Sequence, residues 1–360
     1  MNFKSYFLVF IVNLLLVCSL HASPNATIAK LLENANAKGE FSGVVLAAQN
    51  DKIIFQGAVG KANRQWNIAN KFSTKFRICS VTKQFTAMLI LQLVEAGKVN
   101  LDSTVAKYLP EFRKDTASKI KIRSLLLSAS GLPLLPDEFY VNEDVKTTDA
   151  SFVINKYLQG DLLFESGAKF NYNNGDFLIL SAIVERVSGK SYETNLREKI
   201  LQPLGMKNSG LLKNENVVEN LADGYSFKDG RFFNESFVQI QNFGAAGAMY
   251  STAEDLLLWD KALMANKILS KKFTDEMFTP SDKLGFVALG SWSYKLKLGG
   301  AEKTIVERQG SINGFCALNI IVPEEKISLI FLRNTETQTL FQTYASRGLS
   351  FEVLKLITEK

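Results

Sequence analysis

The pattern of apolar and polar positions predicts strands near both ends of the chain. Apolar runs at 41–48 and 53–59 are separated by Gln-Asn-Asp-Lys, a sequence typical of a β-hairpin turn. Two further runs, 315–322 and 327–333, are separated by the turn Pro-Glu-Glu-Lys and predict a second hairpin. These four runs are the main β-strand candidates of the sequence.

The central part of the chain has helical spacing instead. Residues 85–94 are apolar almost all round and Gly97 follows them, so we expect a helix in the middle of a core that ends at this glycine. Amphipathic spacing predicts further helices at 26–37, 105–112, 122–127, 150–158, 177–187, 192–200, 253–264 and about 340–357.

Strands at both ends and helices between them favour one sheet shared by the two ends of the chain. We therefore expect an α+β fold, in which an antiparallel sheet of N- and C-terminal strands is flanked by helices and a large, mainly helical insert walls a cleft. The sheet subdomain would comprise about 23–75 and 285–360, and the helical subdomain about 80–280.

Residues 1–22 have the pattern of a secretory signal peptide. Lys4 precedes the apolar run 6–20, and the small residues Ala22-Ser23 follow it. This run is too short to span a bilayer comfortably, and its flanks are those of a signal peptide. We expect cleavage after Ala22 and a periplasmic or secreted protein with no stable membrane insertion; an uncleaved membrane anchor is the alternative.

Composition excludes several classes of function. The only histidine, His21, lies in the predicted signal peptide, so a mature chain has no Ser-His-Asp triad and no histidine zinc site. Loss of Lys4 leaves 41 basic and 36 acidic residues, a mild excess that is spread along the chain and makes nucleic acid a poor partner. Nothing in the sequence calls for a metal or a cofactor.

Two cysteines, Cys79 and Cys316, remain after the predicted cleavage. They could pair in an oxidising compartment, but we favour two free, buried thiols. Cys316 lies six residues beyond Gly310, which is about 20 Å along an extended strand and too far for a bridge.

The candidate chemistry is concentrated at Ser80-Val-Thr-Lys83, at the start of the buried helix. Side chains at positions i and i+3 share a helix face, so the Lys83 amine can reach the Ser80 hydroxyl. Burial lowers the pKa of a lysine and lets it take a proton from a serine, which is otherwise a poor nucleophile. Taken alone, this tetrapeptide is a weak signal that chance often supplies.

Two later motifs follow in a matching order: Tyr172-Asn-Asn174 and Arg308-Gln-Gly310, the latter at the opening of a glycine-rich strand. With Ser-x-x-Lys, they make the chain resemble the serine β-lactamase and penicillin-binding protein superfamily, particularly its class C β-lactamase branch, which includes D-alanyl-D-alanine carboxypeptidases and esterases. The resemblance extends over about 41–334 and implies one β-lactamase-like catalytic domain, 23–360.

The resemblance also implies a role for each residue. Ser80 would be the nucleophile, Lys83 its base, and Tyr172 a partner in the proton transfer. Asn174 would hold the substrate and orient Lys83, and the backbone N–H groups of Ser80 and Ser311 would form an oxyanion hole. The small Gly310 would let substrate approach the strand edge and pair with it.

Arg308 departs from the family, whose members usually have lysine or histidine there. It keeps the positive charge but cannot exchange protons near neutral pH, so we expect it to bind a substrate carboxylate or to support Tyr172. The resulting hypothesis is an exported hydrolase that acts through a Ser80 acyl-enzyme on a β-lactam, a D-alanyl peptide or a small ester, thus on small-molecule or peptidoglycan-derived substrates. A non-catalytic or acylation-only penicillin-binding sensor or scaffold, weakened by Arg308, is the alternative.

Overall fold

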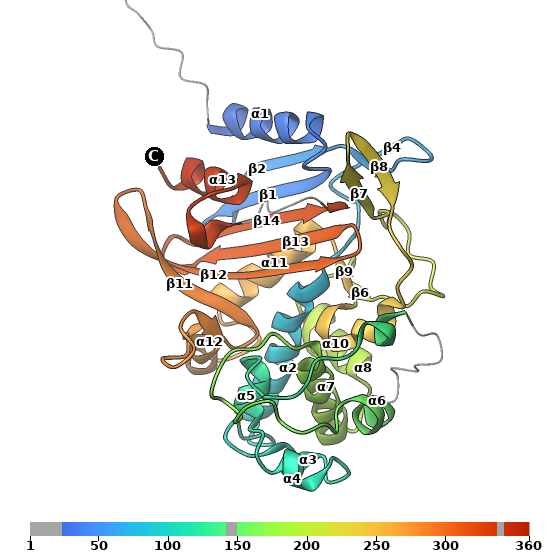
Figure 1. Ribbon diagram of the computed structural model, residues 1–360. Helices are drawn as coiled ribbons and strands as arrows, with labels where there is room; N and C mark the ends of the chain where they lie inside the picture. Colours follow the sequence, from blue (N-terminus) through green and yellow to red (C-terminus); the bar gives the residue numbers. More distant parts are fainter. Residues whose placement is uncertain (1–23, 142–149, 337–341, 360) are drawn as a thin grey trace, which may run out of the picture.

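The computed structural model describes residues 24–141, 150–336 and 342–359, and Figure 1 shows a twisted sheet between two layers of helices. The predicted signal peptide, residues 1–22, lies outside these described residues. Within them, no helix is both long and apolar enough to cross a bilayer.

The large sheet has seven antiparallel strands in the order β10-β11-β12-β13-β14-β1-β2. The strands are β1 (Gly43–Gln49), β2 (Lys52–Val59), β10 (Val287–Ala288), β11 (Ser291–Leu298), β12 (Ala301–Ile312), β13 (Phe315–Val322) and β14 (Ile327–Arg333). β1 pairs with β14, with Val44 opposite Leu332, so the two ends of the chain do share one sheet. The predicted α+β fold class is confirmed.

Both predicted hairpins are present, and their turns follow from residue type. Asn50 and Asp51 join β1 to β2 with φ angles of 49° and 66°. Asparagine and aspartate tolerate this left-handed region better than most residues, and two such residues suit a tight hairpin turn. β13 and β14 are joined by a short 3₁₀ turn, η5 (Pro323–Glu325), after which Lys326 has a φ of 50°.

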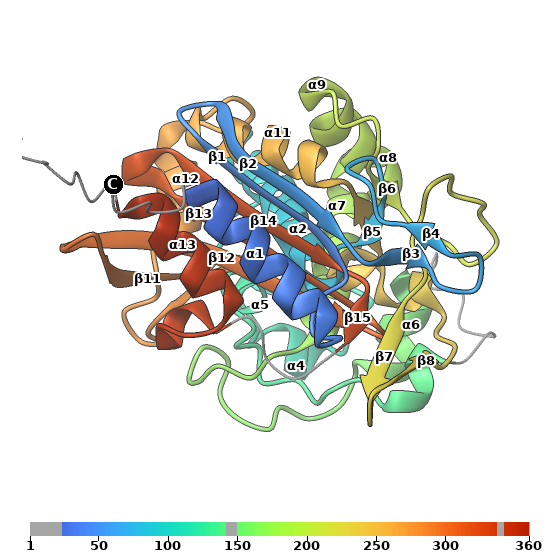
Figure 2. The ribbon, with the colours of Figure 1, turned by 90° about the horizontal axis from the view of Figure 1, so that it is seen from above.

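Helices cover both faces of the sheet. α1 (Pro24–Ala37) and α13 (Leu349–Thr358) lie over one face, as Figure 2 shows. The other face packs on α11 (Ala253–Met264) and on η1 (Cys79–Val81), a 3₁₀ turn that leads into α2 (Thr82–Glu95). α2 is buried along its first ten residues and ends where Gly97 has a φ of 70°, so the predicted core helix and its stop are confirmed.

Most of the remaining elements belong to the helical layer (Figure 1) or to three small sheets, and η6 (Thr343–Ala345) leads into α13. The helices are α3 (Val105–Tyr108), α4 (Lys114–Ala117), α5 (Ile122–Leu126), η2 (Asp137–Tyr140), α6 (Ala150–Tyr157), α7 (Asn174–Ser188), α8 (Tyr192–Leu196), the π-helical η3 (Arg197–Leu201), α9 (Gln202–Leu204), η4 (Ile240–Phe243), α10 (Gly244–Gly247), α12 (Lys271–Phe278) and η6 (Thr343–Ala345). The short strands are β3 (Lys61–Asn63), β4 (Ile68–Ala69), β5 (Phe76–Arg77), β6 (Gly210–Leu211), β7 (Tyr225–Lys228), β8 (Arg231–Asn234), β9 (Met249–Ser251) and β15 (Thr335–Glu336).

The last helix is shorter than the apolar pattern predicts. The sequence predicts a helix over about 340–357, whereas α13 begins at Leu349 after η6 and a glycine, Gly348, with a φ of 86°. Such a φ breaks a helix that apolar spacing alone would continue. Residues 340 and 341 of the prediction lie outside the described residues.

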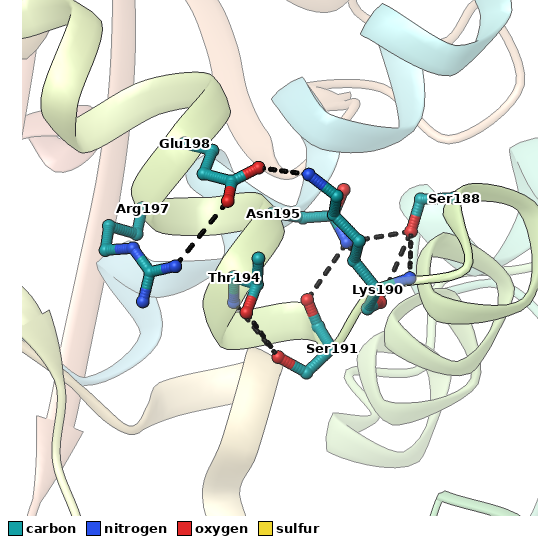
Figure 3. Close-up of polar contacts among 7 residues, drawn as sticks. All are labelled: Ser188, Lys190, Ser191, Thr194, Asn195, Arg197 and Glu198. Carbon is teal, nitrogen blue, oxygen red and sulfur yellow. Dashed lines mark hydrogen bonds and ion pairs between the residues drawn. The ribbon is translucent and has the colours of Figure 1, made fainter.

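A cluster of polar contacts fixes the junction between α7 and α8 (Figure 3). Ser191 caps α8 by accepting a hydrogen bond from the Thr194 amide, and the Asn195 side chain donates to the Ser188 hydroxyl. The junction places buried Tyr192 so that its hydroxyl lies 2.7 Å from that of Thr86 on α2. The helix that follows Ser80, α2, is thereby tied to its neighbour α8.

Candidate active site

Ser80 lies on a sharp bend between β5 and α2. The residue before it, Cys79, is fully buried and has a φ of 50°, a conformation that costs a non-glycine residue on the order of 1 kcal/mol. The bend leaves Ser80 half-buried rather than buried like both of its neighbours. Strained backbone at a candidate nucleophile is the kind of outlier that points to a functional site.

The Lys83 amine approaches Ser80 from the next turn, as the spacing predicts. Its side chain is fully buried, and Nζ donates to Ser80 Oγ at 3.2 Å, to Asn174 Oδ1 at 2.8 Å and to the carbonyl oxygen of Ala246 at 2.7 Å. An ammonium has three N–H donors, and these three acceptors match them.

Tyr172 and Asn174 reach the same point from the start of α7. Between them Asn173, which is buried, accepts a hydrogen bond from the Gly175 amide and donates to the carbonyl oxygens of Leu132 and Pro133. This N-cap fixes the chain on either side of it. The Tyr172 hydroxyl oxygen lies 2.6 Å from Ser80 Oγ.

Arg308 lies against the other side of Tyr172. Its side chain is 3% exposed; Nη2 donates to the Tyr172 hydroxyl oxygen at 2.9 Å and Nε donates to the carbonyl oxygen of Ser80 at 3.1 Å. The guanidinium also lies 5.1 Å from the ring centroids of Tyr172 and Trp292. Its fork is therefore occupied by protein groups, a geometry that fits support of Tyr172 better than capture of a substrate carboxylate.

The charges around Tyr172 set the pKa values of the site. Burial lowers the pKa of Lys83 to about 8, with Arg308 acting in the same direction and Tyr172 opposing it. For Tyr172, the enclosure of its hydroxyl end acts to raise the pKa, but the charges of Lys83 and Arg308 outweigh it and lower the pKa to about 8. The residue as a whole is 36% exposed. The two groups titrate as a coupled pair.

Gly310 is where β12 comes closest to the nucleophile. A Cβ atom there would lie 2.4 Å from the amide nitrogen of Ser80 and 2.7 Å from the carbonyl oxygen of Ile78, so only glycine fits. Side chains alternate along a strand, so Ser311 points to the opposite face. Its hydroxyl lies 3.4 Å from Cys316 Sγ and 3.4 Å from Glu336 Oε1, which leaves only its backbone for a role at the site.

Two groups that the sequence analysis did not identify complete the site. Asn174 Nδ2 donates to the Tyr140 hydroxyl at 3.0 Å, and the Tyr140 ring stacks on Phe243 with centroids 4.4 Å apart. The other group is the carbonyl oxygen of Ala246 on α10. A backbone oxygen has no signature in the sequence, and no motif surrounds Tyr140. Only the glycine-rich segment Gly244-Ala-Ala-Gly247 could have indicated a break in the chain at α10.

Cys79 and Cys316 are both free and buried, as predicted, but the distance argument for this was wrong. The chain reverses at Asn313-Gly314, and β13 returns along β12 so that Cys316 lies opposite Ser311. Cys316 is therefore near Cys79 rather than about 20 Å away along a strand. Burial raises the pKa of the Cys79 thiol far above its usual range, and Cys316 adds to the effect.

The model of the beta-lactamase family matches residues 28–348, which includes every group just described. The chain belongs to the beta-lactamase family. The resemblance inferred from the three motifs is thus confirmed.

Relatives within the beta-lactamase family have diverse names. The chain is 26% identical over 330 residues to penicillin-binding protein 4* of Bacillus subtilis, covering 87% of this chain and 72% of the relative. It is 30% identical over 238 residues to teichoic acid D-alanine hydrolase of Staphylococcus aureus, covering 66% of this chain and 58% of that relative's length. Among solved structures, the penicillin-binding protein from Bacillus halodurans matches with a TM-score of 0.75 and 25% identity, covering 92% of this chain and 98% of the other.

Proposed function

We propose that this beta-lactamase family member is an exported serine hydrolase that acts through an acyl-enzyme on Ser80. One observation carries the proposal: Ser80 Oγ lies 3.2 Å from Lys83 Nζ and 2.6 Å from the Tyr172 hydroxyl oxygen, on a strained bend. A hydroxyl between two groups with pKa values of about 8 can lose its proton near neutral pH. Export rests on the signal-peptide pattern of residues 1–22.

The proton of Ser80 would pass first to Tyr172. The three donors of a Lys83 ammonium are already taken up by Ser80, Asn174 and Ala246, whereas the Tyr172 oxygen is the nearer group and receives a hydrogen bond from Arg308. Lys83 and Arg308 would hold Tyr172 as a phenolate, and the phenolate would accept the proton during attack. This assigns to Tyr172 the direct base role that the sequence analysis assigned to Lys83.

Substrate would bind along the free edge of β12. Strand β11 pairs with β12 only as far as Trp292 opposite Glu307 among the described residues, so the stretch 308–312 has β13 on one side and an open edge on the other. An extended peptide can add to such an edge as a further strand. The N–H groups of Ser80 and Ser311 would then stabilise the oxyanion of the tetrahedral intermediate.

The substrate would be a β-lactam, a D-alanyl peptide or a small ester. The names of the relatives, penicillin-binding protein and teichoic acid D-alanine hydrolase, support acyl groups of this kind. All three substrates present a carbonyl carbon that a serine can attack to form an acyl-enzyme, and the site described above does not discriminate among them.

The test uses chain purified without residues 1–22 and three substrates: a chromogenic cephalosporin, a D-alanyl-D-alanine peptide and a p-nitrophenyl ester. We expect turnover of at least one substrate, with a mass increase on a Ser80 peptide during a rapid quench. Ser80→Ala should abolish both signals, and Lys83→Ala should lower kcat by at least about 10³. Full turnover by Ser80→Ala would refute the proposal, and a lasting adduct without turnover would favour an acylation-only protein.

A further inference from the structure

A polar cavity of about 290 Å³ lies at the end of β12, beyond the stretch that faces Ser80. It is bounded by β5, by the β12–β13 turn and by the segment that precedes η4. No residue assigned above to the catalytic machinery lines it. The lining residues that matter here are Arg77, Asp223, Glu235, Phe237, Asn313 and Phe315.

The cavity contains the Arg77 guanidinium, which feels the charge of Asp223 but forms no ion pair with it. The Arg77 Nε atom is buried and has no hydrogen-bond partner, and the guanidinium forms no ion pair with any described residue. The guanidinium carbon lies 5.1 Å from the ring centroid of Phe315, and the backbone of Arg77 pairs with Tyr250 of β9. A held, unpaired guanidinium fork is suited to bidentate binding of a carboxylate.

Two carboxylates line the same cavity. Asp223 accepts a hydrogen bond from the Asn63 side chain, and the half-buried Glu235 lies against the turn, close to the position that a Cβ of Gly314 would occupy. Neither forms an ion pair with a described cation. The cavity thus has one positive and two negative groups, separated rather than paired.

This arrangement of charges favours a ligand that carries both a negative and a positive group. A simple anion on Arg77 would face two carboxylates, and a simple cation would leave the buried Nε atom of Arg77 without a hydrogen-bond acceptor, which is costly. An α-amino acid head group carries a carboxylate and an ammonium on the same carbon and satisfies both sets of groups at once.

The distance from the nucleophile sets the length of the ligand. Gly310 faces Ser80, β12 continues for two residues to Ile312, about 7 Å at about 3.3 Å per residue, and the cavity begins at Asn313. A substrate lying along the β12 edge would reach the cavity with the end of a side chain about six bonds from its reacting carbonyl.

We propose that the cavity is an acyl-side subsite for a zwitterionic amino-acid head group, with its carboxylate on Arg77 and its ammonium on Asp223 and Glu235. The proposal deepens the hydrolase function proposed above and rests on it. It narrows the substrate class to esters or amides whose acyl group ends in a free α-amino acid.

The test uses thioesters made through the distal carboxyl group of 2-aminoadipic, 2-aminosuberic and 2-aminosebacic acids. Each is compared with its analogue blocked by N-acetyl and methyl ester groups. Thiol release gives kcat/KM after subtraction of the thiol released without enzyme, which the free amine produces by attack on its own thioester. In the wild-type protein we expect the ratio of free to blocked substrate to be at least tenfold for 2-aminosuberate and lower for the shortest acid. Using the ratio cancels any general loss of activity in a variant.

Arg77→Met should bring the ratio to within about twofold of one, and Asp223→Asn should lower it. The matched control is Arg64→Met, which removes another half-buried arginine, stacked on Phe232 outside the cavity; the ratio should persist in it. A wild-type ratio near one at every chain length would overturn the proposal while leaving hydrolysis intact, as would a ratio that survives Arg77→Met.

If no thioester is cleaved, blocked or free, the hydrolase function is judged on the three substrates named above, and the subsite is judged on binding alone. The cavity is then tested by calorimetry with 2-aminosuberic acid alone. Binding by the wild-type protein that weakens at least tenfold in Arg77→Met supports the subsite, and absence of binding by the wild-type protein overturns it.

Discussion

Replacing Arg308 with glutamine tests whether this arginine acts through Tyr172 or on the substrate. Its Nη2 atom lies 2.9 Å from the Tyr172 oxygen, and its charge lowers the pKa values of both Tyr172 and Lys83. An opposite charge at this distance typically shifts a pKa by about 1–3 units. Because solvent reaches the Tyr172 ring, we take the lower part of that range, about 1–2 units.

The sign follows from the direction of both shifts. Removing the positive charge raises the pKa of Tyr172, so the phenolate that accepts the Ser80 proton forms only at higher pH. The rising limb of kcat/KM, expected near pH 8 in the wild-type protein, should move upward by about 1–2 units. Activity at pH 7 should fall about 10- to 100-fold and recover largely above pH 10.

The assay is p-nitrophenyl ester hydrolysis between pH 6 and 10.5, corrected for spontaneous hydrolysis. Arg308→Lys, which keeps the charge, is the matched control and should shift the limb less. Because the chain has ten tyrosines, phenolate formation is followed at 295 nm as the difference between each protein and the same protein with Tyr172→Phe. A limb that stays in place while activity falls equally at every pH would refute this reasoning and make Arg308 a substrate-binding residue.

Three further predictions follow. Gly310→Ala should reduce kcat by at least about 10², because the new Cβ would lie 2.4 Å from the amide nitrogen of Ser80. In the control Gly160→Ala the new Cβ would meet only a proline side chain at 3.0 Å, so its kcat should stay within about twofold of wild type. A fully active Gly310→Ala would contradict the close approach of β12 to Ser80. Burial raises the pKa of Asp260 to about 8, so between about pH 4 and 8 the folded state holds a proton that the unfolded state has lost, and wild-type stability should fall as pH rises. Denaturant unfolding at pH 5, 6 and 7 should show a decline of up to about 1.4 kcal/mol per pH unit relative to Asp260→Asn, and parallel pH profiles would exclude the buried proton. Tyr140→Phe removes the acceptor of the Asn174 amide and should lower kcat about 3- to 10-fold with intact folding by circular dichroism; an unchanged kcat would show that this bond does not position Asn174.

The parts of the fold that the sequence predicts are those governed by local pattern. The hairpins at Asn50-Asp51 and after Val322 combine apolar runs with turn residues, and α2 is an apolar helix that ends at a glycine. β11 could have been found as well, because Lys295-Leu-Lys-Leu298 alternates polar and apolar residues, but the buried positions 291 and 293 are serines and weaken the apolar pattern. The truncated start of α13 depends on the φ of Gly348, which spacing does not reveal.

At the site, too, the sequence predicts the contacts that follow from local spacing and misses those that depend on how distant segments pack. The approach of Lys83 to Ser80 follows from helix periodicity, and the motifs indicate Tyr172 and Asn174. The return of Cys316 to the side of Ser311 depends on how two strands pair, which a distance counted along one strand cannot capture. The contacts of Tyr140 and Ala246 depend on the packing of η2 and α10 around α7, which no short motif encodes.

The pairing of β1 with β14 has a consequence for the order in which the chain can fold. Val44 and its partner Leu332 are 288 residues apart, and the ribosome adds about 5–20 residues per second, so the first strand waits about 15–60 s for its neighbour. Ser80 and Arg308 likewise stay apart until the late strands emerge. The nascent chain cannot close its sheet around Ser80 before synthesis is nearly complete, so the export proposed above would act on a chain that is still unfolded.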